Sequence, residues 1–182
     1  MGSIRRAGGF TQFELVVCLL LMVVVASTLY SRYMALVVDA ERAAFRGVLG
    51  WLQAGVNVRM SLAVTSGDLG GLHSLEGSNP MVLVAQVMEP PSNYLGELAG
   101  AAAQEARRGS WYFDPDHGVL VYRTKYQRAF DGFVLADDER IGFQLKLRYG
   151  SADKGSNHRI SGLGLEMLDS DGWQRAFAQP LR

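Results

Sequence analysis

Hydrophobic residues fill one long segment near the N-terminus and then become periodic. The run Leu15–Ala26 contains no charged side chain. The segment Phe10–Tyr30, at about 1.5 Å per helical residue, spans roughly the 30 Å of a bilayer core. Beyond it, apolar residues recur every three or four positions, at Val38, Phe45, Leu49, Leu52, Val56 and Met60. This pattern predicts that one helix crosses a membrane and continues outside it, ending near Ser66 and Gly67.

The segment after this helix changes from glycine-rich to strand-like. Gly67–Asn79 is rich in glycine and predicts a loop. Asn79 followed by Pro80 is typical of a helix start, so a short helix is expected over Pro80–Val87. Alternating or aromatic runs then predict strands at Ser110–Asp114, Gly118–Arg123, Ile141–Tyr149, Ile160–Leu168 and Trp173–Phe177.

Tight turns join the predicted strands into hairpins. One turn is expected at Asp114–Gly118 and another at Asp169–Gly172. The expected fold class is therefore α+β, with one long N-terminal helix packed on a small antiparallel sheet of four or five strands.

Composition adds two constraints. The chain has 18 basic and 18 acidic side chains, so no bulk charge attracts it to nucleic acid. Its single cysteine, Cys18, lies inside the apolar run, which excludes an intrachain disulfide. The part outside the membrane must therefore be held together by its hydrophobic core.

Basic residues precede the apolar segment. Arg5 and Arg6 predict, by the positive-inside tendency, a cytoplasmic N-terminus and an outward-facing head. An ordinary secretory signal would be cut after the apolar run, near Ala26–Thr28, where the small-residue pattern is poor. An uncleaved membrane anchor is the other alternative.

Glu14 is a carboxylate near the start of a segment built for lipid. An acidic residue at the centre of a membrane helix costs about 2.5 to 3.5 kcal/mol, and less near an end. Either Glu14 lies at headgroup depth, or it has a functional partner. Its position alone leaves both interpretations open.

The residues Gly9–Val16 resemble the prepilin processing motif of the type IV pilin-like superfamily. The match lies in Gly9, Phe10, Thr11, Glu14 and Leu15. The resemblance implies the pilin fold, cleavage after Gly9 by a membrane-embedded prepilin peptidase, and N-methylation of the new N-terminus at Phe10. It also implies that Glu14 pairs with the N-terminal amine of a neighbouring subunit.

Departures from the motif narrow the expected subfamily. Gln12 and Phe13 replace the usual aliphatic residues, and Ser31 stands where many pilins have a helix-kinking proline. A minor pilin or a type II secretion pseudopilin is therefore expected rather than a major pilin. The head segments around Asn79, Pro90–Glu97 and Ser110–Asp114 resemble those of mannose-sensitive haemagglutinin type pilus systems.

The expected organisation has four segments: a cleaved basic leader (1–9), a transmembrane and filament-core helix (10–30), its amphipathic continuation (31–66) and a globular head (67–182). The protein should begin in the inner membrane, with its head in the periplasm, and then enter a pseudopilus or a surface pilus. Expected partners are other subunits, the prepilin peptidase, the inner-membrane assembly platform and, before assembly, lipid. The alternative is an uncleaved bitopic protein that displays a binding or adhesion head.

Candidate chemistry in the head is sparse. His73, His117 and His158 share no metal-ligand spacing, and no catalytic motif occurs, so neither a cofactor nor an enzymatic activity is expected. Asp169–Gly172 begins like a calcium loop but lacks the later acidic ligands, which favours a turn. Tyr122–Arg128 mixes aromatic and basic residues, as single-stranded nucleic-acid surfaces do, but a solvated strand end is the favoured interpretation.

Overall fold

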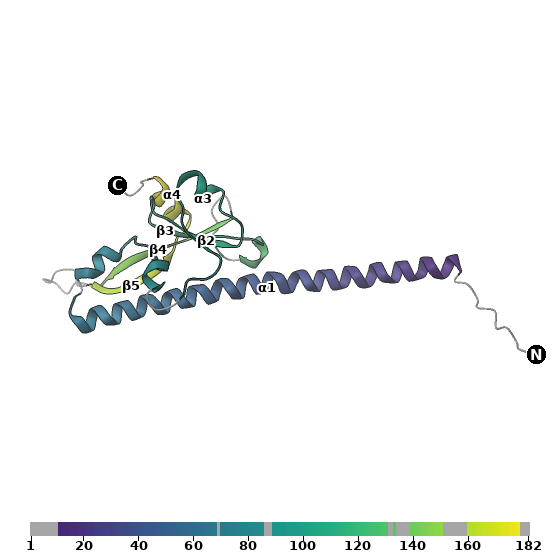
Figure 1. Ribbon diagram of the computed structural model, residues 1–182, viewed down its shortest axis with the longest axis horizontal. Coiled ribbons are helices and arrows are strands. Elements are labelled where there is room, and N and C mark those ends of the chain that lie inside the picture. Colours follow the sequence, from purple (N-terminus) through teal and green to yellow (C-terminus); the bar gives the residue numbers. More distant parts are fainter. Residues whose placement is uncertain are drawn as a thin grey trace, which may run out of the picture. The chain divides into compact units, whose positions relative to one another are not determined.

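The N-terminal helix α1 is continuous over Gln12–Ser66 (Figure 1). The computed structural model describes residues 11–68, 70–85, 89–130, 133, 139–150 and 160–178. Gly67 follows the helix with a φ of 74°, a backbone conformation that glycine adopts without strain, so the predicted end at Ser66 and Gly67 is confirmed. The chain divides into two compact units, Met1–Ala40 and Glu41–Arg182, and the second of these is called the head below.

The head contains a five-stranded sheet with the strand order β1-β2-β3-β4-β5. The strands β2 to β5 correspond to four of the predicted strands, and each pairs antiparallel with the next. The bounds are β1 Tyr94–Glu97, β2 Ser110–Asp114, β3 Val119–Arg123, β4 Arg140–Tyr149 and β5 Ile160–Met167. The predicted α+β fold, a long N-terminal helix with a small sheet, is confirmed.

The prediction of a purely antiparallel sheet is wrong at one edge. The strand β1 pairs parallel with β2, with Tyr94 opposite Trp111 and Glu97 opposite Phe113. A parallel pair needs a crossover connection, and residues 98–109 supply it with the short helix α3, Gly100–Gln104. The strand itself is only four residues long and contains Gly96 at a φ of 84°, so it carries no strand signal in the sequence.

The predicted fifth strand at Trp173–Phe177 is also wrong, because these residues form the helix α4, Ser170–Ala178. Asp169 caps this helix, its Oδ1 accepting a hydrogen bond of 2.6 Å from the backbone N–H of Gly172. Gly142 on β4 leaves space for the Trp173 ring, since a Cβ there would lie 2.9 Å from Trp173 Cζ2. A packing partner distant in sequence therefore decided between helix and strand.

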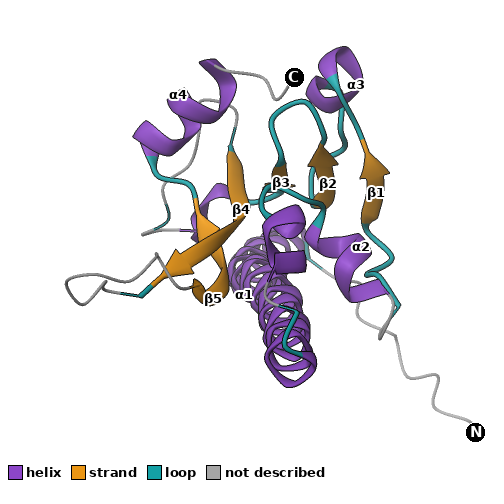
Figure 2. Ribbon diagram, turned by 90° about the vertical axis from the view of Figure 1, so that its left-hand side faces the viewer, coloured by secondary structure: helices purple, strands orange, loops and turns teal. Residues whose placement is uncertain are grey.

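The sheet is covered on both faces by apolar groups of the head. On one face, Phe45 of α1 contacts Trp111, Tyr122 and Phe143, while Val56 belongs to a cluster with Leu145 and other leucines. On the other face, which α3 and α4 cover (Figure 2), Tyr112 and Val121 pack with Trp173 of α4, with Ala103 of α3 and with Ala106. All five residues of β2 are buried, as expected for a strand with two covered faces.

The connection from α1 to the sheet contains two short helices. The predicted helix after Asn79 is present as α2, Pro80–Ala85, and Asn79 Oδ1 accepts a hydrogen bond from the Met81 N–H at 3.0 Å. The predicted loop before it includes the 3₁₀ helix η1, Gly70–Leu75. A second 3₁₀ helix, η2, lies elsewhere, between β3 and β4, and spans Gln127–Phe130. The Asn79 amide also donates to Tyr94 Oη and Glu97 Oε1, which ties the cap of α2 to β1.

Candidate assembly site at the start of helix α1

The first turn of α1 is closed by a reciprocal pair of hydrogen bonds. Glu14 Oε2 accepts from the Thr11 backbone N–H at 3.0 Å and from the Thr11 hydroxyl at 3.1 Å, and the Glu14 N–H donates to Thr11 Oγ1 at 3.2 Å. This arrangement is a capping box, in which the residue before the helix and the third helical residue satisfy each other's backbone donors. The Glu14 carboxylate therefore has local donors within its own chain.

The sequence carried a signal for this contact. A threonine followed three residues later by glutamate, directly before an apolar run, is the signature of a capping box. The interpretation of Glu14 from the sequence named a partner on another subunit and missed Thr11. The other predicted processing residues, Gly9 and Phe10, and the leader charges Arg5 and Arg6 lie outside the described residues.

The apolar residues that follow Glu14 have no cover within the described chain. No residue over 11–40 is buried, and Leu20 and Met22 are 61% and 67% exposed. Among the described residues, α1 is the one helix long and apolar enough to cross a membrane. A surface that is apolar on all sides is stable in lipid or against other apolar helices, and costly in water.

The serine and threonine hydroxyls of this half of α1 are satisfied inside the helix. Ser27 and Thr28 both donate to the Val24 carbonyl at 2.9 Å, and Ser31 donates to the Ser27 carbonyl at 3.0 Å. Such bonds matter in a bilayer, because the lipid core offers no water to a polar group. These three residues therefore fit an apolar surrounding despite their hydroxyls.

Where the head begins, two charged residues of α1 bind the connection between β3 and β4; we call Glu41 and Arg42 the helix clamp. Glu41 Oε1 accepts from the Tyr122 hydroxyl at 2.9 Å and from the Lys125 N–H at 2.7 Å, and Glu41 Oε2 accepts from the Tyr126 N–H at 2.9 Å. Arg42 Nε donates to the Ala129 carbonyl at 2.6 Å. Both residues lie outside the apolar stripe of the helix, and the sequence carried no signal for these contacts.

The helix clamp also explains the mixed aromatic and basic segment Tyr122–Arg128. Tyr122 is 3% exposed and its ring packs on Phe45, so it presents no face on which a base could stack. Burial raises the pKa of Tyr122, and the negative charge of Glu41 and the hydrogen bond to it raise it further. This segment is thus an attachment point for α1.

The first aspartate of each predicted turn accepts a hydrogen bond from the backbone. Asp114 Oδ1 accepts from the Asp116 N–H at 3.0 Å, and Asp169 caps α4. Within the part of the chain that the structure describes, no three His, Cys, Asp or Glu side chains gather where they could hold a metal ion. The Asp169–Gly172 segment is therefore part of a capped helix start and not of a hairpin.

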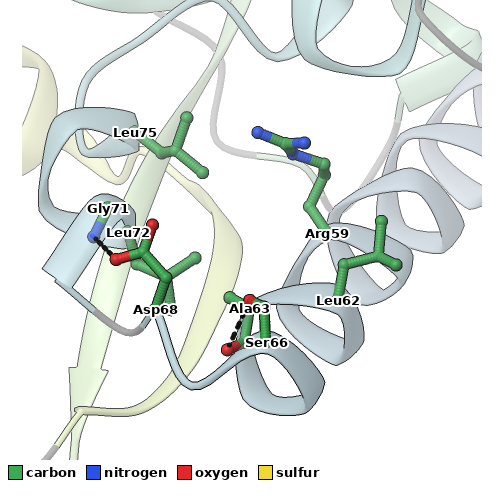
Figure 3. A pocket seen from close by; sticks show the side chains of 8 residues that line it. All are labelled: Arg59, Leu62, Ala63, Ser66, Asp68, Gly71, Leu72 and Leu75. Carbon is green, nitrogen blue, oxygen red and sulfur yellow. Dashed lines mark hydrogen bonds between the residues drawn. The ribbon is translucent and has the colours of Figure 1, made fainter.

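The outer end of α1 borders a hollow of about 250 Å³, the helix-end hollow. Figure 3 shows Arg59 reaching over it from α1, with Asp68 on the opposite side and Leu72 and Leu75 of η1 lining it. The Asp68 carboxylate accepts from the Gly71 N–H at 3.0 Å. A ligand with a single charge would meet both an attractive and a repulsive group here.

Comparison of the chain with protein-family models, with curated proteins and with solved structures found no match. The fold and the contacts of α1 are therefore the observations from which a function is inferred.

Proposed function

We propose that this protein is a structural subunit of a type IV pilus or of a type II secretion-like filament, as a minor pilin or pseudopilin. The observation that carries the proposal is the division of α1. Its first half, Gln12–Ala40, exposes apolar side chains all round, and its second half is built into the core of a small α+β head. The pilin-like fold supports the same function.

The exposed half of α1 requires two successive surroundings. Before assembly, lipid covers its apolar side chains, and the capping box satisfies the Glu14 carboxylate and the N–H groups of Thr11 and Glu14. In the filament, the corresponding helices of other subunits replace lipid. Glu14 then pairs with the N-terminal amine of a neighbouring subunit, an attraction that is strong in a low-dielectric core.

Maturation is proposed to occur between Gly9 and Phe10, by a prepilin peptidase at the inner membrane. Mass spectrometry of the protein from cells with that peptidase should find an N-methylated Phe10 as the first residue. Gly9→Ala should leave the leader attached. An intact Met1 on the wild-type protein would contradict the proposal and support the uncleaved bitopic anchor.

Assembly is tested separately from maturation. Glu14→Val should leave cleavage intact and strongly reduce the amount of subunit found in sheared filaments, because the pairing carboxylate is lost. Asp39→Asn is the matched control, since it removes an exposed carboxylate from the same helix half. Wild-type incorporation of Glu14→Val would refute the pairing role.

A further inference from the structure

A second hollow, unrelated to the assembly site, opens on the head beside α4. It has a volume of about 200 Å³ and lies between β4, α4 and the turn that joins β2 to β3. We call it the α4 hollow. Its polar lining residues are His117, Gln144, Lys146 and Arg175, and Leu168 and Ala176 add apolar surface.

The fold brings these polar side chains together from three elements. Gln144 and Lys146 alternate with buried Leu145 on β4, so they share the sheet face on which Gly142 contacts α4. Arg175 comes from α4. His117 comes from the turn after β2, and its ring stacks on Phe177 of α4 with 4.1 Å between centroids.

The cationic groups around the α4 hollow are only weakly neutralised. Lys146 Nζ lies 3.8 Å from Glu166 Oε2, a long contact between two side chains that are about 40% exposed. Arg175 donates from Nε to the Asp171 carbonyl at 3.2 Å, a bond that leaves its two terminal nitrogens available. Among the described residues that line the hollow, none is acidic.

His117, which also lines the hollow, lies beside a buried carboxylate. Its Nδ1 lies 2.9 Å from Asp114 Oδ2, and the Asp114 side chain is 5% exposed. Together with the stack on Phe177, this contact fixes the ring at the edge of the hollow.

The two hollows of the head differ in charge. The helix-end hollow has Arg59 and Asp68 on facing sides, whereas the α4 hollow has two permanent cations, a histidine and an amide. Arg, Lys and amide donors that line one hollow, without an acidic residue in its described lining, are typical of sites for oxyanions. The nearby apolar surface would suit the carbon skeleton that carries such a group.

From this arrangement we propose that the α4 hollow binds a small polar molecule through an oxyanion, either a phosphate or the carboxylate of an acidic sugar. Arg175 and Lys146 supply the charge, and the Gln144 amide donates a further hydrogen bond. Leu168 and Ala176 contact the rest of the molecule. The site would give the head a ligand of its own, whatever filament or membrane displays it.

The test uses the full chain in non-ionic detergent micelles, with the imidazole C–H signals followed by NMR. Added inorganic phosphate, at constant ionic strength maintained with chloride, should shift the His117 signal in a saturable way. The exposed His73 of η1 lies outside the hollow and serves as the internal reference. Signals are assigned by single His→Gln variants, and glucuronate replaces phosphate in a parallel titration.

Charge variants locate the binding. Lys146→Gln and Arg175→Gln should each weaken the binding about ten-fold. Arg148→Gln should change it less than about two-fold. Arg148 is the matched control because it lies on β4 and its Nε is 3.8 Å from the same Glu166, yet it does not line the hollow.

Each outcome decides the proposal. Saturation by phosphate alone, or by glucuronate alone, supports the site and identifies the source of the oxyanion. The absence of saturation with both probes would overturn it. Equal weakening by Arg148→Gln and Lys146→Gln would also overturn it, since that result indicates a diffuse response to surface charge.

Discussion

The two halves of α1 share one backbone, and they differ in what their apolar residues touch. Over 11–40 no side chain is buried. Over 41–66, Phe45, Leu52, Gly55 and Val56 are buried in the head, while the exposed side mixes polar and small residues with a few apolar ones such as Leu62. The first half buries none of its apolar side chains, whereas the second half buries one apolar face against the rest of the head.

This difference indicates which half contributes to the stability of the isolated chain. A buried Phe or Leu stabilises the folded chain because its apolar surface is removed from water and gains packing contacts. The apolar residues of the first half make no such contribution until lipid or a second subunit covers them. The same substitution should therefore have different consequences in the two halves. In the second half it should reduce the stability of the head, and in the first half it should reduce assembly.

Phenylalanine offers the sharpest test of this comparison. Phe45→Ala should destabilise the head by about 3–5 kcal/mol. The ring it removes packs on Trp111, Tyr122, Phe130 and Phe143. Phe13 is 78% exposed, and Phe13→Ala should leave the head stability unchanged. Urea unfolding in detergent micelles, followed by tryptophan fluorescence, measures both, because all three tryptophans lie beyond residue 41. An equal loss of unfolding free energy in the two variants would contradict the inference that the second half of α1, and not the first, stabilises the head.

Glycines of the second half test its two sides. A Cβ at Gly55 would collide with the side chain of Val84, whereas nothing lies within 4 Å of a Cβ at Gly50. Gly55→Ala should therefore destabilise the head by about 1–3 kcal/mol. Gly50→Ala should stabilise it by up to about 1 kcal/mol, since alanine favours the helix. Thermal unfolding compares the two, and a stabilised Gly55→Ala variant would show that this face of α1 is loosely packed.

The sequence predicted the features that depend on local pattern. The extent of α1, its end at Gly67, the cap at Asn79 and the hairpin of β2 and β3 all follow from periodicity or from turn residues. These signals lie within a few positions of one another in the chain. They could therefore be recognised without knowledge of the tertiary contacts.

The sequence failed where a distant contact decided the outcome. Trp173–Phe177 resembles a strand, and its helical form depends on the packing of Trp173 beside the distant Gly142; the cap from Asp169 was a local signal that was missed. The parallel pairing of β1 depends on a crossover connection, and a strand of four residues leaves no sequence pattern from which that pairing could be predicted. Glu41 and Arg42 appear as ordinary surface charges until the connection after β3 is placed beside them.

The functional residues can be divided in the same way, into those that the sequence revealed and those that it did not. Glu14 was recognised because a carboxylate in an apolar run is conspicuous, and its Thr11 partner was missed although the spacing was present. The α4 hollow had no signal, since its polar residues come from three separate segments. Charge clusters of this kind become visible only after the strands and helices are assembled.

The helix clamp tests the boundary between the two halves. Glu41→Gln should destabilise the head by about 1–2 kcal/mol, because one amide oxygen cannot replace two carboxylate oxygens that accept three hydrogen bonds. Asp39→Asn lies two residues earlier on the exposed half and should change the stability by less than about 0.5 kcal/mol. Urea unfolding at neutral pH measures both. An unchanged free energy of unfolding in Glu41→Gln would show that apolar packing alone holds the head together.

The dependence of the unfolding free energy on alkaline pH is the smallest expected effect. It tests one bond of the helix clamp, the hydrogen bond from Tyr122 to Glu41. Burial first, and then the charge of Glu41, raise the pKa of Tyr122 above its usual value, so the folded head keeps this hydroxyl protonated where the unfolded chain loses the proton. The stabilisation is therefore complete below about pH 10 and declines above it, by at most about 1.4 kcal/mol per pH unit.

Tyr94 supplies the comparison for this titration, because burial also raises its pKa while its hydrogen bond with Asn79 opposes the rise. Tyr122→Phe should flatten the decline in unfolding free energy between about pH 10 and 11 more than Tyr94→Phe does. Glu41→Gln should flatten it partly, since it removes the second cause of the shift and leaves burial in place. An unchanged slope in Tyr122→Phe would mean that Tyr122 loses its proton equally in the folded and unfolded chain, and that the clamp does not hold this hydroxyl against Glu41.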